Sequence, residues 1–323
     1  MAEINIIGAG ITGLAAAVRI LSRSPETKIR IYEASGRVGG RLKPLIVNEW
    51  KKDVANPHLI ASANTAALTY LESIGADIKK NKVSWRTTSL NPFSLYRLFT
   101  ESTQNVPYAN SDKGQGIFLL YKAVTHGMSF YHAKPEDFID LAVNFIKEKN
   151  GIIIPNRKIN SIKEFPKHVP LIVCIDAYNM KRLGLLSGEL KPLPIVNIHF
   201  NDCGSLKKET VLCPNFSFPC VIFVDKENIS VTVSAASKLI TYTDKNIIRI
   251  FGNLLQSLYD EKDFSRAMVF KNIRATVKVT GKRMTCPDNV IVGGDFMNDK
   301  LPPTIESAIV AGNKAADEAL DLL

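Results

Sequence analysis

Three glycines near the start of the chain stand at a spacing that suits phosphate binding. Gly8, Gly10 and Gly13 follow a short apolar segment at 4–7 and precede an alanine-rich segment at 14–21. Glycine at these points permits a tight turn, brings the backbone up to a pyrophosphate, and lets a helix pack closely on its strand. The first N–H groups of that helix would then face the phosphates. The pattern predicts a dinucleotide site, and its alternative is an ordinary strand-to-helix turn.

A carboxylate follows where a ribose would need one. Residues 28–32 have the pattern of a second strand, which ends at Glu33, 20 residues after Gly13. A carboxylate there can accept hydrogen bonds from a ribose 2′-hydroxyl and disfavours a 2′-phosphate. Strand, helix, strand and acid together form one βαβ unit. This complete set favours dinucleotide binding over the ordinary turn.

A second glycine-rich segment begins at Glu33 itself. Residues 33–41 read EASGRVGGR, so two adjacent glycines are flanked by Arg37 and Arg41. The backbone of such a loop can approach a ligand, and its guanidinium groups can neutralise phosphate charge. A nicotinamide dehydrogenase has no need of this segment. Its position directly after the ribose-binding acid favours a second cofactor loop over the alternative, a basic turn.

These motifs together resemble those of a known superfamily. The segments GAGITGL and EASGRVGGR resemble the N-terminal signature of the flavin amine oxidases and the carotenoid or phytoene desaturases. VGGD at 292–295, followed by LPPTIESA at 301–308, resembles the closing motif of the same superfamily. The resemblance implies FAD in a two-domain fold, with the Gly294-Asp295 turn on its ribityl and phosphate portion. It also implies a helix, beginning at Thr304, whose positive end would stabilise an anionic reduced flavin.

Within that superfamily the chain is most similar to the hydroxysqualene dehydroxylases. Residues 272–276 (NIRAT), 301–309 (LPPTIESAI) and 53–58 (DVANPH) carry this resemblance. It implies that reduced FAD delivers a hydride to an allylic cation left by loss of a hydroxyl. The spacing within 53–58 departs from the group, and the chain is shorter than typical members. We expect the missing part to be a helical substrate cover between residues 98 and 127.

The predicted site follows from these motifs and from the resemblance. The predicted cofactor-binding residues are Gly8, Gly10, Ile11, Thr12, Gly13, Glu33, Ala34, Arg37, Gly40, Arg41, Gly294, Asp295, Thr304 and Ile305. His58 is the candidate catalytic residue, because the group's histidine would lie on the substrate side of the flavin and imidazole titrates near neutral pH. We expect FAD to be bound non-covalently, because neither glycine motif contains Cys or His. No metal site is expected, because the other histidines have no ligand spacing.

The fold predicted is α/β, with a Rossmann-like FAD-binding domain and a discontinuous α+β substrate domain that contains an antiparallel sheet. The FAD-binding domain is predicted at 1–62, 134–190 and 271–323, a shortened cap at 63–133, and the substrate domain at 191–270. Strands are expected at 4–7, 28–32, 152–154, 169–175, 195–200, 221–224, 229–234 and 289–292, and helices at 14–21, 64–75, 137–149 and 304–322.

Composition restricts the class of the protein, its partners and its redox compartment. With 46% hydrophobic and 22% charged residues it can bury a large core, which excludes disordered and low-complexity classes. The formal charge of +10 permits nucleic acid, anionic lipid or acidic partners. Because no nucleic-acid module is present, the charge favours an anionic membrane surface. Five cysteines without a CxxC pair indicate a reducing cytosol.

No apolar run is long enough to span a bilayer. We therefore expect a cytoplasmic protein that can attach to the inner face of the membrane. The aromatic stretch 92–99 could line a substrate tunnel, touch a bilayer or pack in the core. The function predicted is an FAD-dependent oxidoreductase acting on an isoprenoid lipid such as hydroxysqualene, with an unidentified electron partner. The alternatives are a flavin amine or carotenoid-type oxidase and a non-catalytic flavoprotein that acts as a binding partner.

Overall fold

The N-terminal glycine motif follows the central strand of a five-stranded parallel sheet. The computed structural model describes residues 2–42, 46–47, 52–53, 58–88, 121–122, 125–126, 129–234, 236–260 and 264–323. The strand order is β16 (Val290–Val292), β10 (Leu171–Val173), β1 (Glu3–Ile7), β2 (Lys28–Tyr32) and β9 (Ile152–Ile154). The chain leaves β1 toward β2 on one side and reaches β10 on the other. The crevice beyond the carboxyl ends of β1 and β10 is where such sheets bind ligands.

Helices cover this sheet closely. They are α1 (Ile11–Arg23), α2 (Thr65–Ser73), α5 (Pro135–Glu148) and α8 (Ile305–Leu320), with the shorter α6 (Ala177–Arg182) following β10. The alanines of α1 are fully buried, and a Cβ on Gly312 of α8 would lie 2.3 Å from the carbonyl oxygen of Thr12. Small residues therefore let α8, at the end of the chain, pack directly on the first helix.

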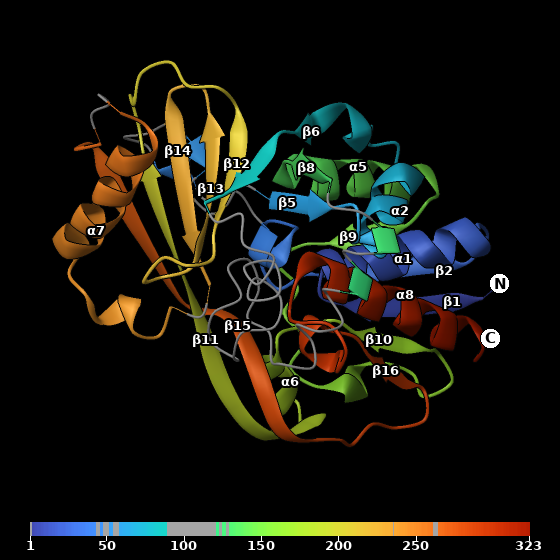
Figure 1. Ribbon diagram of the computed structural model, residues 1–323. Coiled ribbons are helices and arrows are strands. Elements are labelled where there is room, and N and C mark those ends of the chain that lie inside the picture. Colours follow the sequence, from blue (N-terminus) through green and yellow to red (C-terminus); the bar gives the residue numbers. More distant parts are fainter. Residues whose placement is uncertain are drawn as a thin grey trace.

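A six-stranded sheet forms the second layer. Its order is β15 (Ala267–Met284), β11 (Leu186–Phe200), β14 (Asn228–Val233), β13 (Cys220–Asp225), β12 (Glu209–Cys213) and β7 (Trp85–Thr87). All neighbours are antiparallel except β7 and β12. Figure 1 shows this sheet on the left and the parallel sheet with its helices on the right. The long strands β11 and β15 run from one part to the other.

The two faces of the six-stranded sheet have different neighbours. Alternate residues of β11, β13 and β14 pack against α7 (Asp244–Leu258), whose buried face includes Phe251. The opposite face is turned toward a small sheet in the order β5 (His58–Ala61), β8 (Phe130–Ala133) and β6 (Lys82–Val83). Because side chains alternate along a strand, one face can belong to a core and the other to a site.

The remaining elements are short. They are the strands β3 (Ile46–Val47) and β4 (Lys52–Asp53) and the 3₁₀ helices η1 (Gly40–Leu42), η2 (Ile78–Asn81), η3 (Ile162–Glu164), η4 (Leu239–Thr241) and η5 (Asp295–Met297). Within the part of the chain that the structure describes, no helix is long and apolar enough to cross a membrane.

The predicted fold class is confirmed. The strand predicted at 195–200 is only the last part of β11, which begins at Leu186. The prediction missed the first half of the strand because most of its residues are not buried and do not form an apolar run. The predicted domain boundaries at 190/191 and 270/271 fall inside β11 and β15, and the division into domains stays a prediction. The aromatic stretch 92–99 and most of 98–127 lie outside the described residues.

Candidate functional site

A cavity of about 830 Å³ lies between the two sheets. On one side it is lined by residues that follow the parallel strands, among them Gly8, Glu33 and Cys174. On the other side it is lined by the six-stranded sheet and by β5 and β8. The cavity thus begins at the crevice that the topology of the parallel sheet predicts, and it continues to the face of the second sheet.

The first glycine turn leaves no room for other side chains. Gly8 has a φ of +100°, and a Cβ there would lie 2.2 Å from the carbonyl oxygen of Cys174. A Cβ on Gly13 would lie 2.0 Å from the carbonyl oxygen of Gly8. Gly8, Gly10, Ile11 and Thr12 line the cavity, whereas Gly13 does not. Gly13 therefore shapes the turn by letting α1 close against it.

The second glycine motif lies directly on the first. The N–H of Gly39 donates to the carbonyl oxygen of Ala9 at 2.8 Å. A Cβ on Gly40, where φ is +56°, would lie 3.1 Å from the Cα of Gly10. Bare backbone from two loops therefore forms one wall of the cavity, as an approaching pyrophosphate requires.

Glu33 lies at the cavity wall with its carboxylate already held. One oxygen accepts the N–H of Ala9 at 3.0 Å, and the other accepts the N–H and the hydroxyl of Ser35 at 2.9 and 2.8 Å. These bonds fix the carboxylate beside the first glycine turn. Ala34 also lines the cavity, whereas Arg37 is exposed and does not line it.

Arg41 joins three distant segments of the chain. Its guanidinium pairs with Asp295 at 2.7 Å and donates to the carbonyl oxygen of Ala275 at 2.9 Å. Burial opposes the charge of Arg41, but the carboxylates of Asp295 and Asp176 together outweigh it and raise the pKa of the guanidinium. The second glycine motif, the Gly294-Asp295 turn and β15 therefore meet at one ion pair on the cavity wall.

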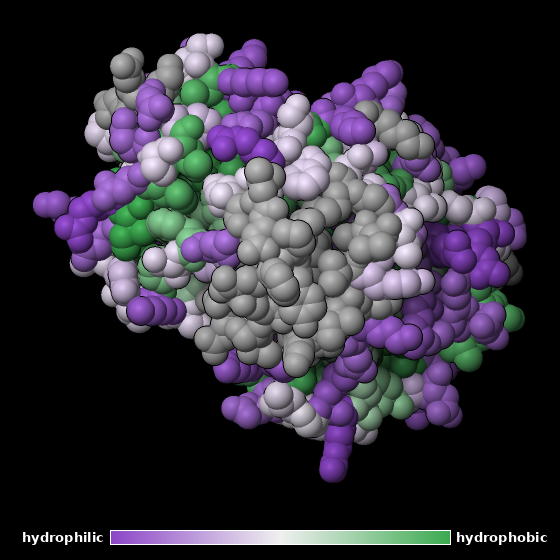
Figure 2. Space-filling view, viewed as in Figure 1, coloured by the Kyte–Doolittle hydropathy of each residue, from purple (hydrophilic) through white to green (hydrophobic). Residues whose placement is uncertain are grey.

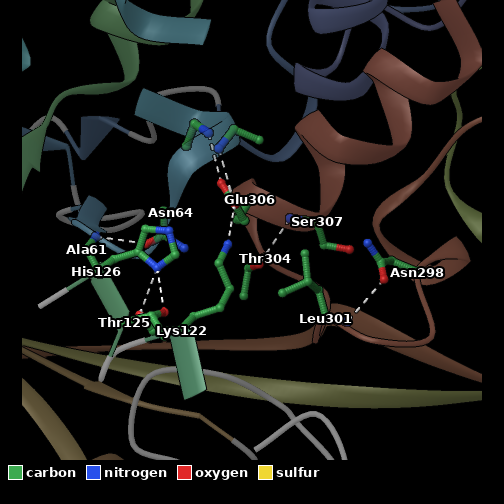
Figure 3. A network of polar contacts seen from close by, with 12 residues as sticks. Ala61, Asn64, Lys122, Thr125, His126, Asn298, Leu301, Thr304, Glu306 and Ser307 are labelled. Carbon is green, nitrogen blue, oxygen red and sulfur yellow. Dashed lines mark hydrogen bonds and ion pairs between the residues drawn. The ribbon is translucent and has the colours of Figure 1, made fainter. Parts of the chain in front are cut away.

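The N-terminus of α8 faces the same cavity. The hydroxyl of Thr304 caps the helix by accepting the N–H of Ser307 at 3.3 Å, and the Ser307 hydroxyl donates to the carbonyl oxygen of Asp295 at 2.9 Å. Thr304 and Ile305 line the cavity together with Gly294 and Asp295. Figure 3 shows Thr304 and Ser307 at the start of the helix. The positive end of the α8 dipole is thus directed at the site.

His58 lines the cavity from β5. Its ring meets that of Phe138 edge to face, with centroids 6.3 Å apart. Burial lowers the pKa of His58 to about 4, so the imidazole is neutral at pH 7. The structure places His58 at the cavity wall, and its catalytic role stays a prediction, as do the roles of the cofactor-binding residues.

The far side of the cavity was not predicted residue by residue. It is lined by Ile195, Asn197, Val221, Phe223, Thr232 and Ser234, which lie on β11, β13 and β14 or, for Ser234, directly after β14. The Thr232 hydroxyl donates to the side-chain oxygen of Asn197 at 2.9 Å. The period-two pattern of these strands was visible, but it did not indicate which face would line a site. Cys174, which follows β10, was missed as well.

Comparisons with known proteins agree with this geometry. Residues 6–72 match the family model described as NAD(P)-binding Rossmann-like domain. A hydroxysqualene dehydroxylase of Zymomonas mobilis is 24% identical over an alignment of 418 residues that covers 99% of each chain. Because this chain has 323 residues, the relative carries segments that it lacks.

Solved structures give the same fold. An oxidoreductase from Methanosarcina mazei has a TM-score of 0.70 at 12% identity, covering 98% of this chain and all of its own. Cyclohexylamine oxidase from Brevibacterium oxydans has a TM-score of 0.62 at 12% identity and covers 99% of both chains. The chain is therefore similar over its whole length to a hydroxysqualene dehydroxylase and shares the fold of an amine oxidase. The resemblance predicted from the motifs is confirmed.

Proposed function

We propose that the protein binds FAD and uses it to replace the hydroxyl group of an isoprenoid lipid, such as hydroxysqualene, by hydrogen. The observation that carries this proposal is that one cavity joins two unlike walls. The glycine turns, Glu33 and the Arg41–Asp295 pair form a wall suited to a dinucleotide. The face of β11, β13 and β14 forms a wall suited to a neutral molecule.

The residues present fit FAD. A cradle of bare backbone at Gly10 and Gly40 would take the pyrophosphate, and the Glu33 carboxylate would take a ribose. Arg41 would offset phosphate charge, and the start of α8 at Thr304 would face the flavin ring. When bound in its reduced form, FAD supplies a hydride. The chain orients the cofactor and the substrate and excludes water.

The sheet face favours a neutral substrate over an amine. Its lining side chains are apolar, amide or hydroxyl, and none of those described there is charged. An ammonium group would need a carboxylate or an aromatic cage to replace its lost hydration. The carboxylates that line the cavity, such as Glu33 and Asp295, are held by other groups at the opposite wall. The Asn197–Thr232 pair offers a place for one hydroxyl.

His58 is proposed to handle the proton that a departing hydroxyl takes up. Its lowered pKa keeps the imidazole neutral in most protein molecules at pH 7, and the rare protonated form is a stronger acid than an ordinary imidazolium. The ring lies on the cavity wall at the start of β5. A neutral imidazole can also accept the hydroxyl proton in a hydrogen bond and thereby orient the substrate.

We propose that the cofactor is held without a covalent bond. Cys174 is the one described cysteine that lines the cavity, and burial raises the pKa of its thiol to about 12. A thiol in that state is a poor nucleophile. Acid precipitation should therefore release yellow flavin into the supernatant. Flavin retained in the pellet would show a covalent link.

The substrate proposal is tested by anaerobic mixing. The protein with reduced FAD is mixed with hydroxysqualene, and the protein with oxidised FAD is mixed with putrescine and with cyclohexylamine. We expect the reduced flavin to be oxidised by the hydroxylated isoprenoid, with formation of the dehydroxylated hydrocarbon, and no bleaching by either amine. Bleaching by an amine would favour the oxidase alternative. Absence of both reactions would favour a non-catalytic flavoprotein.

A lipid substrate has to be reached at a membrane, so we propose peripheral attachment on the cytoplasmic side. The formal charge is +10, and Figure 2 shows hydrophilic side chains over much of the visible rim. Vesicles containing anionic lipid should bind the protein at low salt, and binding should weaken as salt rises because the attraction is screened. A protein that ignores such vesicles at low salt would contradict this part of the proposal.

A further inference from the structure

Helix α2 is capped by a residue from the other end of the chain. Its own N-cap residue, Asn64, makes no side-chain cap bond, because its oxygen accepts the N–H of Ala61 instead. The Glu306 carboxylate accepts the N–H of Ala66 at 3.2 Å with one oxygen and that of Ala67 at 2.8 Å with the other. These are free donors of the first turn, which a cap normally satisfies.

The same carboxylate forms a buried ion pair. The ammonium of Lys122 lies 2.9 Å from Glu306, and the two side chains are only 12% and 2% exposed. Figure 3 shows the lysine reaching Glu306 from the side opposite the two backbone N–H groups. In a buried pair, removal of either partner leaves the other charge uncompensated.

Glu306 also lines the cavity, on the side where the N-terminus of α8 would face the flavin. It lies in the first turn of α8, follows Thr304 and Ile305, and lines the cavity as they do. Two helix N-termini, those of α2 and α8, therefore meet at one carboxylate, and Lys122 balances its charge. The cap of α2 does not require Lys122, because the Glu306 carboxylate accepts the N–H groups of Ala66 and Ala67 without it.

We propose that the Lys122–Glu306 pair fixes the net charge beside the flavin ring and so sets the reduction potential of bound FAD. This inference rests on the FAD binding of the proposed function and not on the substrate. Both are positioning residues. Glu306 connects α8 to the start of α2, which follows β5 and His58 in the chain. Lys122 neutralises the charge of the Glu306 carboxylate. An anionic reduced flavin would respond to either charge left alone.

The two charges predict shifts of opposite sign. Glu306→Gln keeps an oxygen for the α2 cap but leaves the Lys122 ammonium unpaired, which should favour reduced flavin. Lys122→Met leaves the carboxylate unpaired, which should disfavour it. For each variant we expect about a tenfold change in the ratio of the dissociation constants of oxidised and reduced FAD, which is about 30 mV for a two-electron couple. The double variant should return to the wild-type potential.

The experiment is an anaerobic redox titration of the holoprotein, followed by the flavin absorbance. Lys314→Met and Glu318→Gln are matched controls, because they break an exposed ion pair of the same types on the same helix. They should leave the potential unchanged. Lys122→Arg keeps the positive charge and should restore the wild-type potential. If Glu306→Gln does not hold FAD, Lys122→Met and Lys122→Arg decide the matter.

Equal weakening of oxidised and reduced FAD in both single variants would show a merely structural pair and overturn the inference. A wild-type protein that binds no FAD would overturn it too. Potentials that shift as expected in a protein inert toward hydroxysqualene would uphold the inference while the substrate proposal fails. Turnover of hydroxysqualene with unshifted potentials would support the substrate proposal and overturn the inference about the ion pair.

Discussion

The two walls of the cavity are built in different ways. The wall beneath α1 and α8 consists of close-packed backbone, with Gly8 and Gly40 in conformations that favour glycine, and it carries Glu33, Arg41 and Asp295. The opposite wall consists of side chains that project from one face of a sheet. Backbone geometry cannot change without refolding, whereas side chains on a sheet face can be exchanged one at a time.

This contrast separates what recognises the cofactor from what recognises the substrate. Substitutions at the glycine wall should damage FAD binding and folding together, because the turn and the cradle are the same atoms. Substitutions at the sheet wall should alter turnover alone. Each of the following predictions tests one side of that division.

The largest effect is expected for Gly8→Ala. Its φ of +100° and a Cβ 2.2 Å from the Cys174 carbonyl oxygen add strain to a backbone clash. We expect the free energy of unfolding to fall by about 3–5 kcal/mol, with loss of FAD binding. Gly184→Ala is the matched control, because Gly184 has a φ of +75° with no atom within 4 Å of the added Cβ. It should cost about 1 kcal/mol in denaturant titrations. Equal losses in the two variants would show that the contact with Cys174 is unimportant.

The glycine wall was also the part that the sequence revealed best. Gly8, Gly10, Gly13 and Glu33 lie within one βαβ unit, so their spacing along the chain sets their geometry. At each of these positions the local backbone geometry or the ribose contact requires one residue type, so the sequence alone indicates the site.

The sheet wall had no such local signal. The strands of Asn197 and Thr232 were predicted, yet only their pairing in register makes the two side chains neighbours. The cap of α2 by Glu306 spans about 240 positions of the chain. Neither contact could be inferred from spacing, because tertiary packing decides which distant residues meet.

The next largest effect is expected for Glu33→Ala. We expect FAD binding to weaken by about 1.5–3 kcal/mol, the scale of a charge-assisted hydrogen bond to a ribose hydroxyl. Ser35→Ala removes one donor to the carboxylate but keeps the acid, and should cost less. Calorimetric titration of the FAD-free protein measures both. Retention of wild-type affinity by Glu33→Ala would place the ribose elsewhere.

A third prediction concerns pH, and it compares His58 at the cavity with His132 away from it. Burial lowers the pKa of each to about 4. The unfolded chain, with a pKa of 6.5, takes up the proton first, so stability is fully present above pH 6.5 and falls as pH drops toward 4. Each histidine should contribute about 1–2 kcal/mol of loss between pH 6.5 and pH 5. His58→Asn and His132→Asn should each reduce that loss in urea titrations. Only His58→Asn should also reduce turnover, and equal effects on turnover would remove His58 from the mechanism.

The smallest effect is expected on the sheet wall. Thr232→Val keeps the shape of the side chain but removes the hydroxyl that donates to Asn197. If this pair orients a substrate hydroxyl, kcat/KM for hydroxysqualene should fall about tenfold, which is about 1.4 kcal/mol, the size of one hydrogen bond. FAD affinity should not change, because Thr232 belongs to the wall opposite the glycine turns.

Thr210→Val makes the same substitution on β12 of the same sheet and serves as the control. The Thr210 hydroxyl is buried and has no hydrogen-bond partner among the described residues. Its removal should therefore leave turnover unchanged and the stability equal or higher, since a buried hydroxyl without a partner costs free energy. A fall in FAD affinity in Thr232→Val, or equal turnover in the two valine variants, would mean that cofactor and substrate are not recognised by separate walls. The sheet face would then act as packing, and the substrate hydroxyl would be bound by residues outside this pair.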